Sequence, residues 1–315
     1  MLVDIVVVGS LVTDYITRTP SFPRPGETVF GHGLSIGFGG KGANQCLMAA
    51  KLGAATAFVG KLGHDAVGDN YLDELKRTTI NIDHVTRTSL AQSAVANVVV
   101  DDNGENCIVN IPGSNRLMTV EDVNAAAEVI KSAKVLICQN EISFDATKAA
   151  LTIARQNGVV TVLNAGPAVP NLDPEILNNS DIVCVNETEA EVLTGVPVSG
   201  VADAVSAAKV LLTQGCREAV ITLGAKGAVS LDLTSLAAGT DHEWVPAEKV
   251  VAVDTTGAGD AFIGAMAFYL AKMPTLPTKE KLRRSCAIAT QSVLKPGAWL
   301  SLPAREELPS HLFDE

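Results

Sequence analysis

The sequence contains no apolar run that approaches the roughly 20 residues of a membrane-spanning helix. It also lacks an excess of basic residues, because 24 lysines and arginines face 35 aspartates and glutamates, which gives a formal charge of -11. A nucleic-acid-binding protein needs a basic face, so we expect neither a nucleic acid nor a membrane as a partner. Internal repeats, low-complexity segments and long charge runs are missing too. The 315 residues suffice for one large α/β domain, alone or with a small appendage.

Closely spaced cysteines are absent as well. The six cysteines lie far apart, mostly inside apolar runs: Cys46, Cys107, Cys138, Cys184, Cys216 and Cys286. This pattern is typical of reduced core thiols rather than of disulfides or a metal site. The first eight residues have no basic segment and include an early acid, Asp4, which indicates a strand rather than a signal peptide. We therefore expect a cytoplasmic protein.

The pattern that organises the chain is DTTGAGDAF at residues 254–262, which follows a short β-branched run. The apolar stretch at 261–271 predicts a buried helix, so the motif is expected at a helix N-terminus, where unpaired N–H groups and the helix dipole favour an anion. Gly257 and Gly259 would let a phosphate approach those N–H groups. A lone Asp260 would be interpreted as a helix cap. The glycine–alanine–glycine ahead of it indicates instead a phosphate site with a base beside it.

A second set of signals lies near the N-terminus. Residues 4–9 form an apolar run that predicts a strand buried on both faces of a parallel sheet, and Asp14 follows its carboxyl end, where open α/β sheets bind ligands. A simple turn acid is the alternative for Asp14. The run GFGGKGANQ at residues 37–45 opens a predicted helix and contains G-x-G-x-x-G. It does not close the first βαβ unit, so we favour a polyhydroxy ligand, with Lys41 and Asn44 as donors, over a dinucleotide.

The rest of the chain alternates strands and helices. Helices are expected at residues 66–77, 120–133, 144–157, 187–194, 201–214 and 279–293, and strands at 56–60, 134–139, 159–163, 181–185, 219–223 and 228–231. This alternation predicts a doubly wound, mostly parallel central sheet with helices on both faces.

Two regions break that rhythm. Residues 27–36 alternate like an exposed strand, and residues 94–100 and 106–111 flank Asn103 and Gly104, a strong hairpin signal. We predict that they form a small antiparallel β lid. The lid is assigned to residues 15–36 and 92–114, and the α/β body to residues 1–14, 37–91 and 115–315.

Polar residues follow several predicted strands. Glu141 comes after the strand at 134–139 and by itself would be a helix-capping acid. Asn186 and Glu189 form N-x-x-E at a helix start, either an asparagine cap with favourable acids or an oxygen cluster for a hydrated Mg²⁺ near phosphates. The glycine-rich turn TLGAKG at 222–227 is either a hairpin or the wall of a nucleotide site.

Four motifs together resemble the ribokinase-like carbohydrate kinases over essentially the whole length: GFGGKGANQ at 37–45, NETEAE at 186–191, TLGAKG at 222–227 and DTTGAGDAF at 254–262. The last motif is specific for the superfamily, and GGKGANQ indicates its ribokinase branch. The resemblance implies ATP-dependent phosphorylation of the 5-hydroxyl of D-ribose. It further implies Mg²⁺ and a monovalent cation, K⁺, as cofactors.

The resemblance also implies roles for individual residues. Asp260 would be the base, and Gly257, Ala258 and Gly259 the anion hole. The sugar-binding residues would be Asp14, Gly39, Gly40, Lys41, Asn44, Glu141 and Asp260. The nucleotide and its phosphates would contact Asn186, Thr222, Gly224, Gly227, Gly257 and Gly259, with Mg²⁺ held by Asn186 and Glu189, mostly through water. The monovalent cation would lie among Asp254, Thr256, Ser292, Gly297 and Ser301.

The chain departs from the family pattern at two places. Val12 stands where bacterial-type ribokinases often have asparagine, so one hydrogen bond to the sugar is expected to be missing or supplied elsewhere. The loop at residues 295–301 carries Trp299 and Leu300 where small and polar residues are usual, next to the expected cation and adenine sites.

Three other functions stay open from sequence. The first is a kinase for another pentose, a ketohexose or a nucleoside. The second is a nicotinamide-dependent oxidoreductase that uses residues 37–42, and the third is a non-catalytic sugar-binding relative. Asp260 and the N-x-x-E pair argue against the last.

The lid raises the question of assembly. So small a sheet exposes unpaired edges and one apolar face, to which we assign Phe30, Val95, Val99 and Ile108. A second copy of the same sheet would cover that face through one two-fold contact. We therefore expect a homodimer whose lids pack on each other, in keeping with the family's habit.

Overall fold

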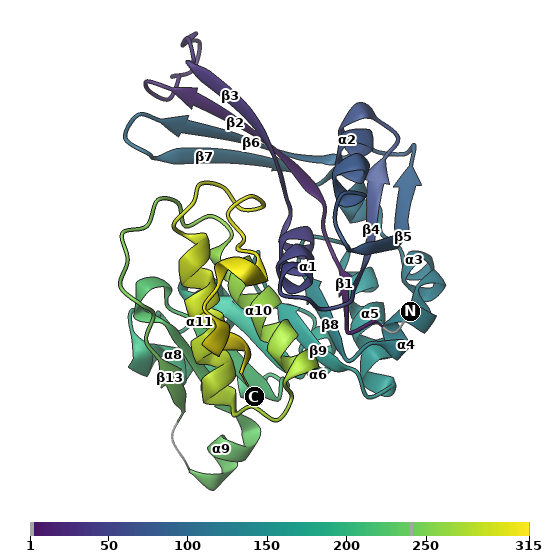
Figure 1. The fold of residues 1–315 in the computed structure, drawn as a ribbon, viewed down its shortest axis with the longest axis vertical. Coiled ribbons are helices and arrows are strands. Elements are labelled where there is room, and N and C mark those ends of the chain that lie inside the picture. The colour runs from purple at the N-terminus through teal and green to yellow at the C-terminus, as the bar shows by residue number, and fades with distance from the viewer. Residues whose placement is uncertain (1–2, 240–241, 315) are drawn as a thin grey trace.

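The computed structural model describes residues 3–239 and 242–314, and its centre is a nine-stranded sheet (Figure 1). Within the described residues the strand order is β13-β12-β11-β10-β9-β8-β1-β4-β5. The strands are β1 (Ile5–Val8), β4 (Thr56–Gly63), β5 (Asn81–Thr88), β8 (Val135–Gln139), β9 (Val160–Asn164), β10 (Ile182–Asn186), β11 (Glu218–Thr222), β12 (Ala228–Asp232) and β13 (Glu243–Val245). Pairing is parallel from β5 to β11 and antiparallel at β12 and β13. The predicted doubly wound, mostly parallel sheet is confirmed.

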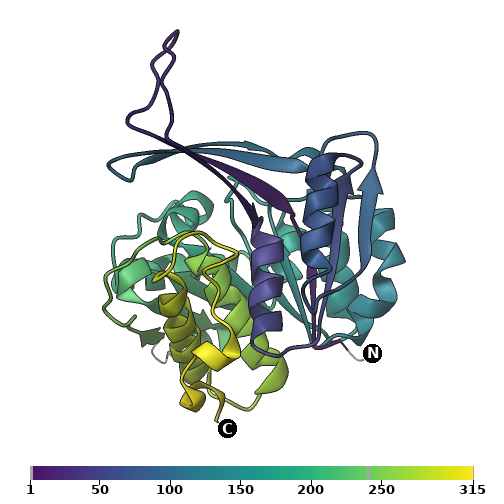
Figure 2. The ribbon, with the colours of Figure 1, turned by 45° about the horizontal axis from the view of Figure 1, so that its top comes forward.

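Helices cover both faces of this sheet (Figure 2). One face carries α1 (Lys41–Lys51), α2 (Ala66–Leu75), α10 (Ala258–Lys272) and α11 (Thr278–Ser292). The other carries α3 (Val120–Ala125), α4 (Ala127–Ser132), α5 (Phe144–Gln156), α6 (Pro174–Asn178), α7 (Glu187–Thr194), α8 (Val201–Thr213) and α9 (Leu233–Ala238). Short 3₁₀ turns complete the chain: η1 (Gly113–Leu117), η2 (Gly224–Lys226), η3 (Arg305–Glu307) and η4 (Ser310–Phe313).

Two hydrophobic cores lie on either side of the sheet. In β1, Ile5 and Val7 enter the core under α1 and α10, whereas Val6 and Val8 enter the core under α5. Because successive side chains point to opposite faces, a strand covered on both sides reads as an unbroken apolar run. The predicted buried helix is confirmed, since α10 packs between α1 and α11 with eleven of its 15 residues buried. No helix of the described residues has the length and apolar character needed to cross a membrane.

A separate four-stranded sheet, here called the lid, projects beyond the body and extends over the side that carries α10 and α11 (Figures 1 and 2). Its strands, in spatial order, are β3 (Gly33–Gly39), β2 (Val12–Thr19), β6 (Ala94–Asp101) and β7 (Asn106–Ile111). The outer pairs are antiparallel and the central pair, β2 with β6, is parallel. The predicted hairpin is present, with Gly104 at φ +82° in its turn. The small separate sheet is confirmed, while the exact boundaries of lid and body stay a prediction.

The register of the lid corrects the apolar face assigned from sequence. Val98 pairs with Ile108, and Val99 pairs with Cys107. Paired residues share a face and neighbours along a strand alternate, so Ile108 lies on the face opposite Val99. Phe30 lies outside all four strands. The face that includes Val99 is completed by Val95, Leu34, Ile36 and Val109, and we call it the outer lid face.

Several elements differ from the sequence-based expectation. The strand expected at 27–36 begins only at Gly33, because its partner β2 ends near Arg18 and leaves the preceding residues nothing to pair with. The helix expected at 120–133 is divided at Ala126, whose backbone is not helical. The elements β2, β5, β13, α6 and α9 were not predicted.

Candidate active site

The carboxyl ends of five central strands meet the N-termini of α1 and α10 at one edge of the sheet. A cavity of about 140 Å³ lies there. Seven of the predicted site residues line it: Lys41, Asn186, Glu189, Thr222, Gly257, Gly259 and Asp260. Segments more than 200 residues apart in the chain therefore meet at one small polar cavity.

The N-terminus of α10 is open toward this cavity. Gly257 precedes the helix at φ +79°, a conformation that favours glycine. Among the described residues, the backbone N–H groups of Gly257, Gly259 and Asp260 have no hydrogen-bond acceptor. A Cβ atom placed on Gly259 would meet no atom within 4 Å. Free N–H groups facing open space at the positive end of a helix form a site for an anion.

Asp260 lies in the first turn of α10 and is only 7% exposed. Its Oδ2 accepts a hydrogen bond from Asn44 Nδ2 and its Oδ1 one from Gln45 Nε2, both at 2.9 Å. Burial raises the pKa of Asp260, while Lys41 and the two amides oppose that rise. The carboxyl is thus a buried group of raised basicity beside the anion site.

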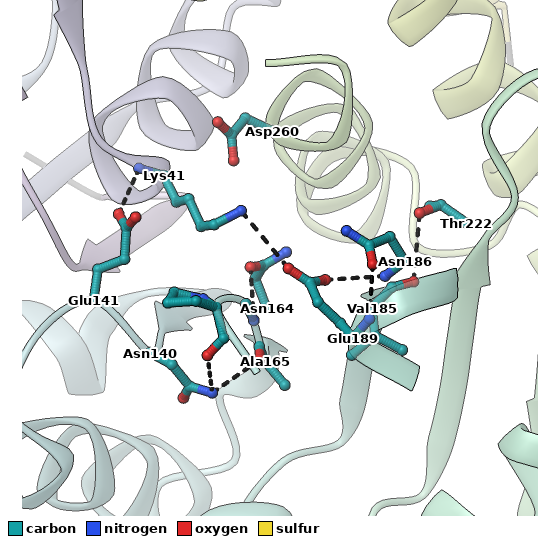
Figure 3. A network of polar contacts seen from close by, with 12 residues as sticks. Lys41, Asn140, Glu141, Asn164, Ala165, Val185, Asn186, Glu189, Thr222 and Asp260 are labelled. Carbon is teal, nitrogen blue, oxygen red and sulfur yellow. Dashed lines mark hydrogen bonds and ion pairs between the residues drawn. The ribbon is translucent and has the colours of Figure 1, made fainter. Parts of the chain in front are cut away.

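Lys41 begins α1 and extends toward Glu189, with 3.9 Å between Nζ and Oε1 (Figure 3). Burial alone would lower the pKa of Lys41, but the carboxylates of Asp260, Glu189 and Glu141 together raise it. Lys41 is therefore held as a cation among acids at the rim of the cavity.

Glu141 acts as a cap for α1, the simpler of the two possibilities considered from sequence. Its Oε2 accepts hydrogen bonds from the Lys41 backbone N–H at 2.9 Å and from the Ser10 hydroxyl. Burial raises the pKa of Glu141, although Ser10 and Lys41 counteract it. No donor among the described residues contacts its other oxygen, Oε1. Capping therefore leaves one carboxylate oxygen available to a ligand.

Asp14 and Asn44 present unpaired acceptors in the same region. Burial, followed by the charges of Glu141 and Asp260, raises the pKa of Asp14 to about 6. The carbonyl oxygen of Asn44 is buried without a donor among the described residues. A Cβ atom on Gly39 would lie 2.6 Å from Asp14 Oδ2, so only glycine lets the lid strand approach the acid this closely. Such acceptors suit the hydroxyl groups of a polyol.

Asn186 and Glu189 form a capping box at the start of α7. Asn186 Oδ1 accepts from the Glu189 N–H at 2.8 Å, and Glu189 Oε2 accepts from the Asn186 N–H at 3.0 Å. Glu189 Oε1 is left to face Lys41 and the cavity. Within residues 3–239 and 242–314 no group of three or more His, Cys, Asp or Glu side chains gathers to hold a metal. One carboxylate oxygen and one amide nevertheless fit a Mg²⁺ that keeps most of its water.

The turn at 222–227 is a hairpin between β11 and β12. Thr222 reaches the cavity and its hydroxyl donates to the Val185 carbonyl at 3.4 Å. Gly224 and Gly227 have positive φ, and a Cβ on Gly227 would lie 1.8 Å from the Val245 carbonyl oxygen. The two glycines shape the turn, whereas Thr222 faces the cavity.

The residues predicted for a monovalent cation come together only in part. Asp254 Oδ1 accepts from Thr256 N and Oγ1 at 2.9 and 2.6 Å, and Asp254 Oδ2 accepts from Gly297 N at 2.8 Å. The Val293 carbonyl, next to Ser292, accepts from Asp254 N at 3.3 Å. Ser301 is fully buried and donates to a carbonyl of its own loop. Asp254 thus draws two loops into one cluster rich in oxygen atoms.

The two departures from the family pattern are structural in this chain. Val12 is 5% exposed and packs at the base of the lid. Trp299 is also 5% exposed and packs against Phe38 of the lid and Tyr71 of α2, while Leu300 is 80% exposed. Trp299 Nε1 donates to a carboxylate of α2, that of Glu74, at 3.2 Å.

Comparison with known proteins agrees with this geometry. Residues 3–305 match the family described as pfkB family carbohydrate kinase. The ribokinase of Mus musculus is 48% identical over 98% of this chain and 94% of its own length. The deoxyribokinase of Salmonella typhi is 35% identical over 98% of both. The structure of Arabidopsis thaliana ribokinase complexed with ribose and ATP has a TM-score of 0.87 at 29% identity, covering 98% of this chain and 97% of that one.

The chain belongs to the pfkB family of carbohydrate kinases. The resemblance seen in four motifs is confirmed over nearly the full length. The glycine-rich run at residues 37–42 passes from the lid strand β3 into α1 and lies outside the parallel sheet. It is therefore not the first turn of a dinucleotide-binding βαβ unit.

Sequence reasoning missed four polar residues of this pfkB site. Ser10 holds Glu141, Gln45 holds Asp260, Gln139 donates to Gln45 Oε1 at 2.8 Å, and Asn164 lines the cavity. Gln139 and Asn164 each end a buried strand, and that position was the available signal.

Proposed function

We propose that the chain transfers the terminal phosphoryl group of ATP to the 5-hydroxyl of D-ribose. The observation that carries the proposal is a buried carboxylate, Asp260, in the first turn of a helix whose N-terminal amides are free and face a polar cavity. The chain is an ATP-dependent sugar kinase, and the mouse relative at 48% identity is a ribokinase.

The sugar would lie between the lid and the start of α1. Asp14, the carbonyl of Asn44 and the free oxygen of Glu141 would accept hydrogen bonds from its hydroxyl groups. Gly39 and Gly40 would form the backbone turn beside the ring, a turn that requires glycine at residue 40, where φ is +94°. Three acceptors on three separate elements would fix a small polyol in one orientation.

Phosphoryl transfer has a loose, charge-rich transition state, so positioning and anion stabilisation dominate catalysis. The free amides of Gly257 and Gly259 would meet the charge of the transferring group, with Ala258 between them in the turn and Lys41 beside them. Asp260 would take the proton of the attacking hydroxyl as the new bond to phosphorus forms. The lid would close over the sugar and exclude water, a competing acceptor.

We also propose two ions. Mg²⁺ would be held through water by Asn186 and Glu189, where it neutralises phosphate charge. K⁺ would lie near Asp254, Thr256 and Gly297, with Ser292 and Ser301 in the adjoining segment. The cluster of hydroxyl, carbonyl and carboxylate oxygens around Asp254 supports the second site.

Two further proposals concern the protein in its cell. A homodimer through the lids is supported by the exposed apolar side chains of the outer lid face. A cytoplasmic location is supported by six free thiols, five of them buried.

The test is ATP-dependent ADP release with D-ribose, 2-deoxy-D-ribose, D-fructose and adenosine as acceptors. We expect D-ribose to give the highest kcat/KM. Preference for 2-deoxyribose, as in the name of the Salmonella relative, would keep the mechanism and change the substrate. Binding without ADP release would indicate a non-catalytic relative. Cofactor absorbance without phosphorylation would indicate an oxidoreductase.

A further inference from the structure

Two buried glutamines form a chain that ends on Asp260. Gln45 Nε2 donates to Asp260 Oδ1 at 2.9 Å, and Gln139 Nε2 donates to Gln45 Oε1 at 2.8 Å. Gln45 and Gln139 are both fully buried. Gln45 lies in α1 and Gln139 at the end of β8, so the two hydrogen bonds connect the α10 carboxylate to the central sheet. Burying an amide costs free energy unless it is hydrogen-bonded. Two buried glutamines beside a candidate base therefore require an explanation.

The two hydrogen bonds that link Gln139, Gln45 and Asp260 have a fixed direction. An ionised carboxylate only accepts, so Gln45 must turn its NH₂ group toward Asp260. Its carbonyl then points away and requires a donor, which Gln139 supplies. If the Gln45 amide rotated by half a turn, its carbonyl oxygen would face the Asp260 oxygen, and its NH₂ group would face that of Gln139. The arrangement is therefore satisfied only when Asp260 accepts.

Gln139 is oriented by Gln45, whose side-chain carbonyl needs a donor. Its own Oε1 lies close to the backbone of Gly9, just after β1, and of Gly42 in α1, since a Cβ on Gly9 or Gly42 would lie 2.1 or 2.8 Å from it. That oxygen is buried without a donor among the described residues. Gln139 is also the last residue of β8, and its backbone carbonyl accepts a hydrogen bond from the Thr147 hydroxyl at 3.3 Å. The hydrogen bond to Gln45 therefore holds Gln139 as a donor although its own oxygen has no partner among the described residues.

We propose that Gln139, acting through Gln45, keeps the carboxylate of Asp260 ionised and oriented toward the cavity, and that both glutamines are positioning residues of the phosphoryl transfer. The inference rests on the proposed function. Other charges face Asp260 as well: Lys41 from α1 favours its ionised form, and Glu141 and Asp14 disfavour it. The glutamines offset those two acids without adding a charge that would compete for the phosphate.

The first test replaces Gln45 by methionine, which keeps the length of the side chain and removes the donor. We expect kcat with D-ribose to fall roughly 10- to 100-fold, as for loss of one hydrogen bond to a charged group. The acidic limb of the kcat–pH profile should move up by about one pH unit, because Asp260 becomes harder to ionise. KM for ATP should change less than about threefold, since Gln45 is fully buried and exposes no atom to the cavity.

The second test uses Gln139→Met and the double variant. Alone, Gln139→Met should lower kcat and move the acidic limb in the same direction by a smaller amount. In the Gln45→Met background it should lower kcat less than about twofold, because Gln139 acts only through Gln45. If Gln45→Met does not fold, the shift of the acidic limb in Gln139→Met decides by itself.

The matched control is Thr161→Val, at the amino end of β9, which removes a buried hydroxyl bonded to Asn179 O and Asp181. It should lose stability and keep the kcat–pH profile. The wild-type protein is assayed first, since absence of ribose-dependent ADP release there overturns the proposed function and not this inference. With an active wild type, unshifted acidic limbs in both glutamine variants, or fully additive losses of kcat, would overturn it.

Discussion

Around Lys41 the ionisation of single side chains is set by burial more than by pairing. Burial is the largest influence on the pKa values of Asp14, Glu141 and Asp260, and it raises all three. Lys41 is the cation that counteracts the rise at Glu141 and Asp260. Crowded acids with raised pKa values are a feature of functional sites rather than of stable cores. The site therefore carries a cost in stability that a bound sugar would relieve.

The base is the first residue to test. Asp260→Asn keeps the size of the side chain and removes the carboxylate proposed to take the proton. We expect kcat for ribose phosphorylation to fall at least ~10²–10⁴-fold, the range typical of general-base removal. Ribose binding, measured by calorimetry, should stay within a few-fold of wild type. A variant that keeps more than about a tenth of wild-type turnover would contradict the assignment of Asp260.

Asp14 gives a prediction about pH. Its pKa rises from 3.8 to about 6 on folding, so its contribution to stability is fully present below pH 3.8 and is lost as pH rises through 6. The size of that rise corresponds to at most roughly 3 kcal/mol. Asp14→Asn should therefore gain stability relative to wild type between about pH 4 and pH 7, while its KM for ribose increases.

Urea unfolding of both proteins at pH 4.5, 5.5 and 7.5 measures this difference. A stability gain that is the same at all three values would show that the charge of Asp14 is not its cause.

Local motifs predicted the candidate site residues at the start of α10. Gly257, Gly259 and Asp260 are neighbours in sequence, so a single helix start brings them together. Ser10 gains Glu141 as its partner only when β1 and β8 pair in register, 131 residues apart in sequence. Gln139 gains Gln45 only when α1 packs near β8, a contact between positions 94 residues apart. No spacing along the chain encodes these contacts.

At the scale of elements, the well-predicted ones are those with strong periodicity. The helix at 187–194 and most central strands agree within a residue or two. The missed strands are polar or short: β5, NIDHVTRT, is mostly polar and lies at a sheet edge, and β13 has three residues. The lid strand β2 was missed because VTDYITRT follows β1 after a gap of only three residues. Its long extension is stabilised by β3 and β6, which come later in the chain.

The start of α10 offers a prediction with an internal control. Gly259 has open space where a Cβ would lie, so Gly259→Ala should fold at least as well as wild type, since alanine favours helix by up to about 1 kcal/mol. The added methyl group would occupy the anion site, and we expect kcat to fall roughly 10²-fold, as on removal of one oxyanion donor.

Gly264, about one and a half turns further along α10, is the control. A Cβ there would lie 2.6 Å from the backbone carbonyl oxygen of Gln45 and 2.6 Å from Met48 Cβ, both in α1, which packs against α10 at this point. Gly264→Ala should lower the free energy of unfolding by about 1–3 kcal/mol. Thermal unfolding and kcat of both variants separate the effects. Unchanged turnover in Gly259→Ala would argue against an anion at this helix start.

At the scale of the whole molecule, a compact body carries a thin lid, and several apolar side chains on one lid face are exposed. The inner face of the lid includes Asp14 and Gly39 and turns toward the candidate sugar site. On the outer lid face, Leu34, Ile36 and Val109 are 68%, 58% and 63% exposed. Exposed apolar side chains gathered on one face favour an interaction site there.

The last prediction is that this face forms the dimer interface. A two-fold contact would pair each outer lid face with its copy and cover the same apolar side chains on both subunits. Light scattering at micromolar concentration should give about twice the monomer mass of 32.8 kDa. Val109→Lys should shift the mass toward the monomer, because two lysines would then be buried opposite each other. Ile108→Lys, one residue away, equally apolar, 59% exposed and on the inner face, should leave the mass unchanged. A wild-type protein at 32.8 kDa, or equal effects of the two variants, would contradict assembly through the outer lid face.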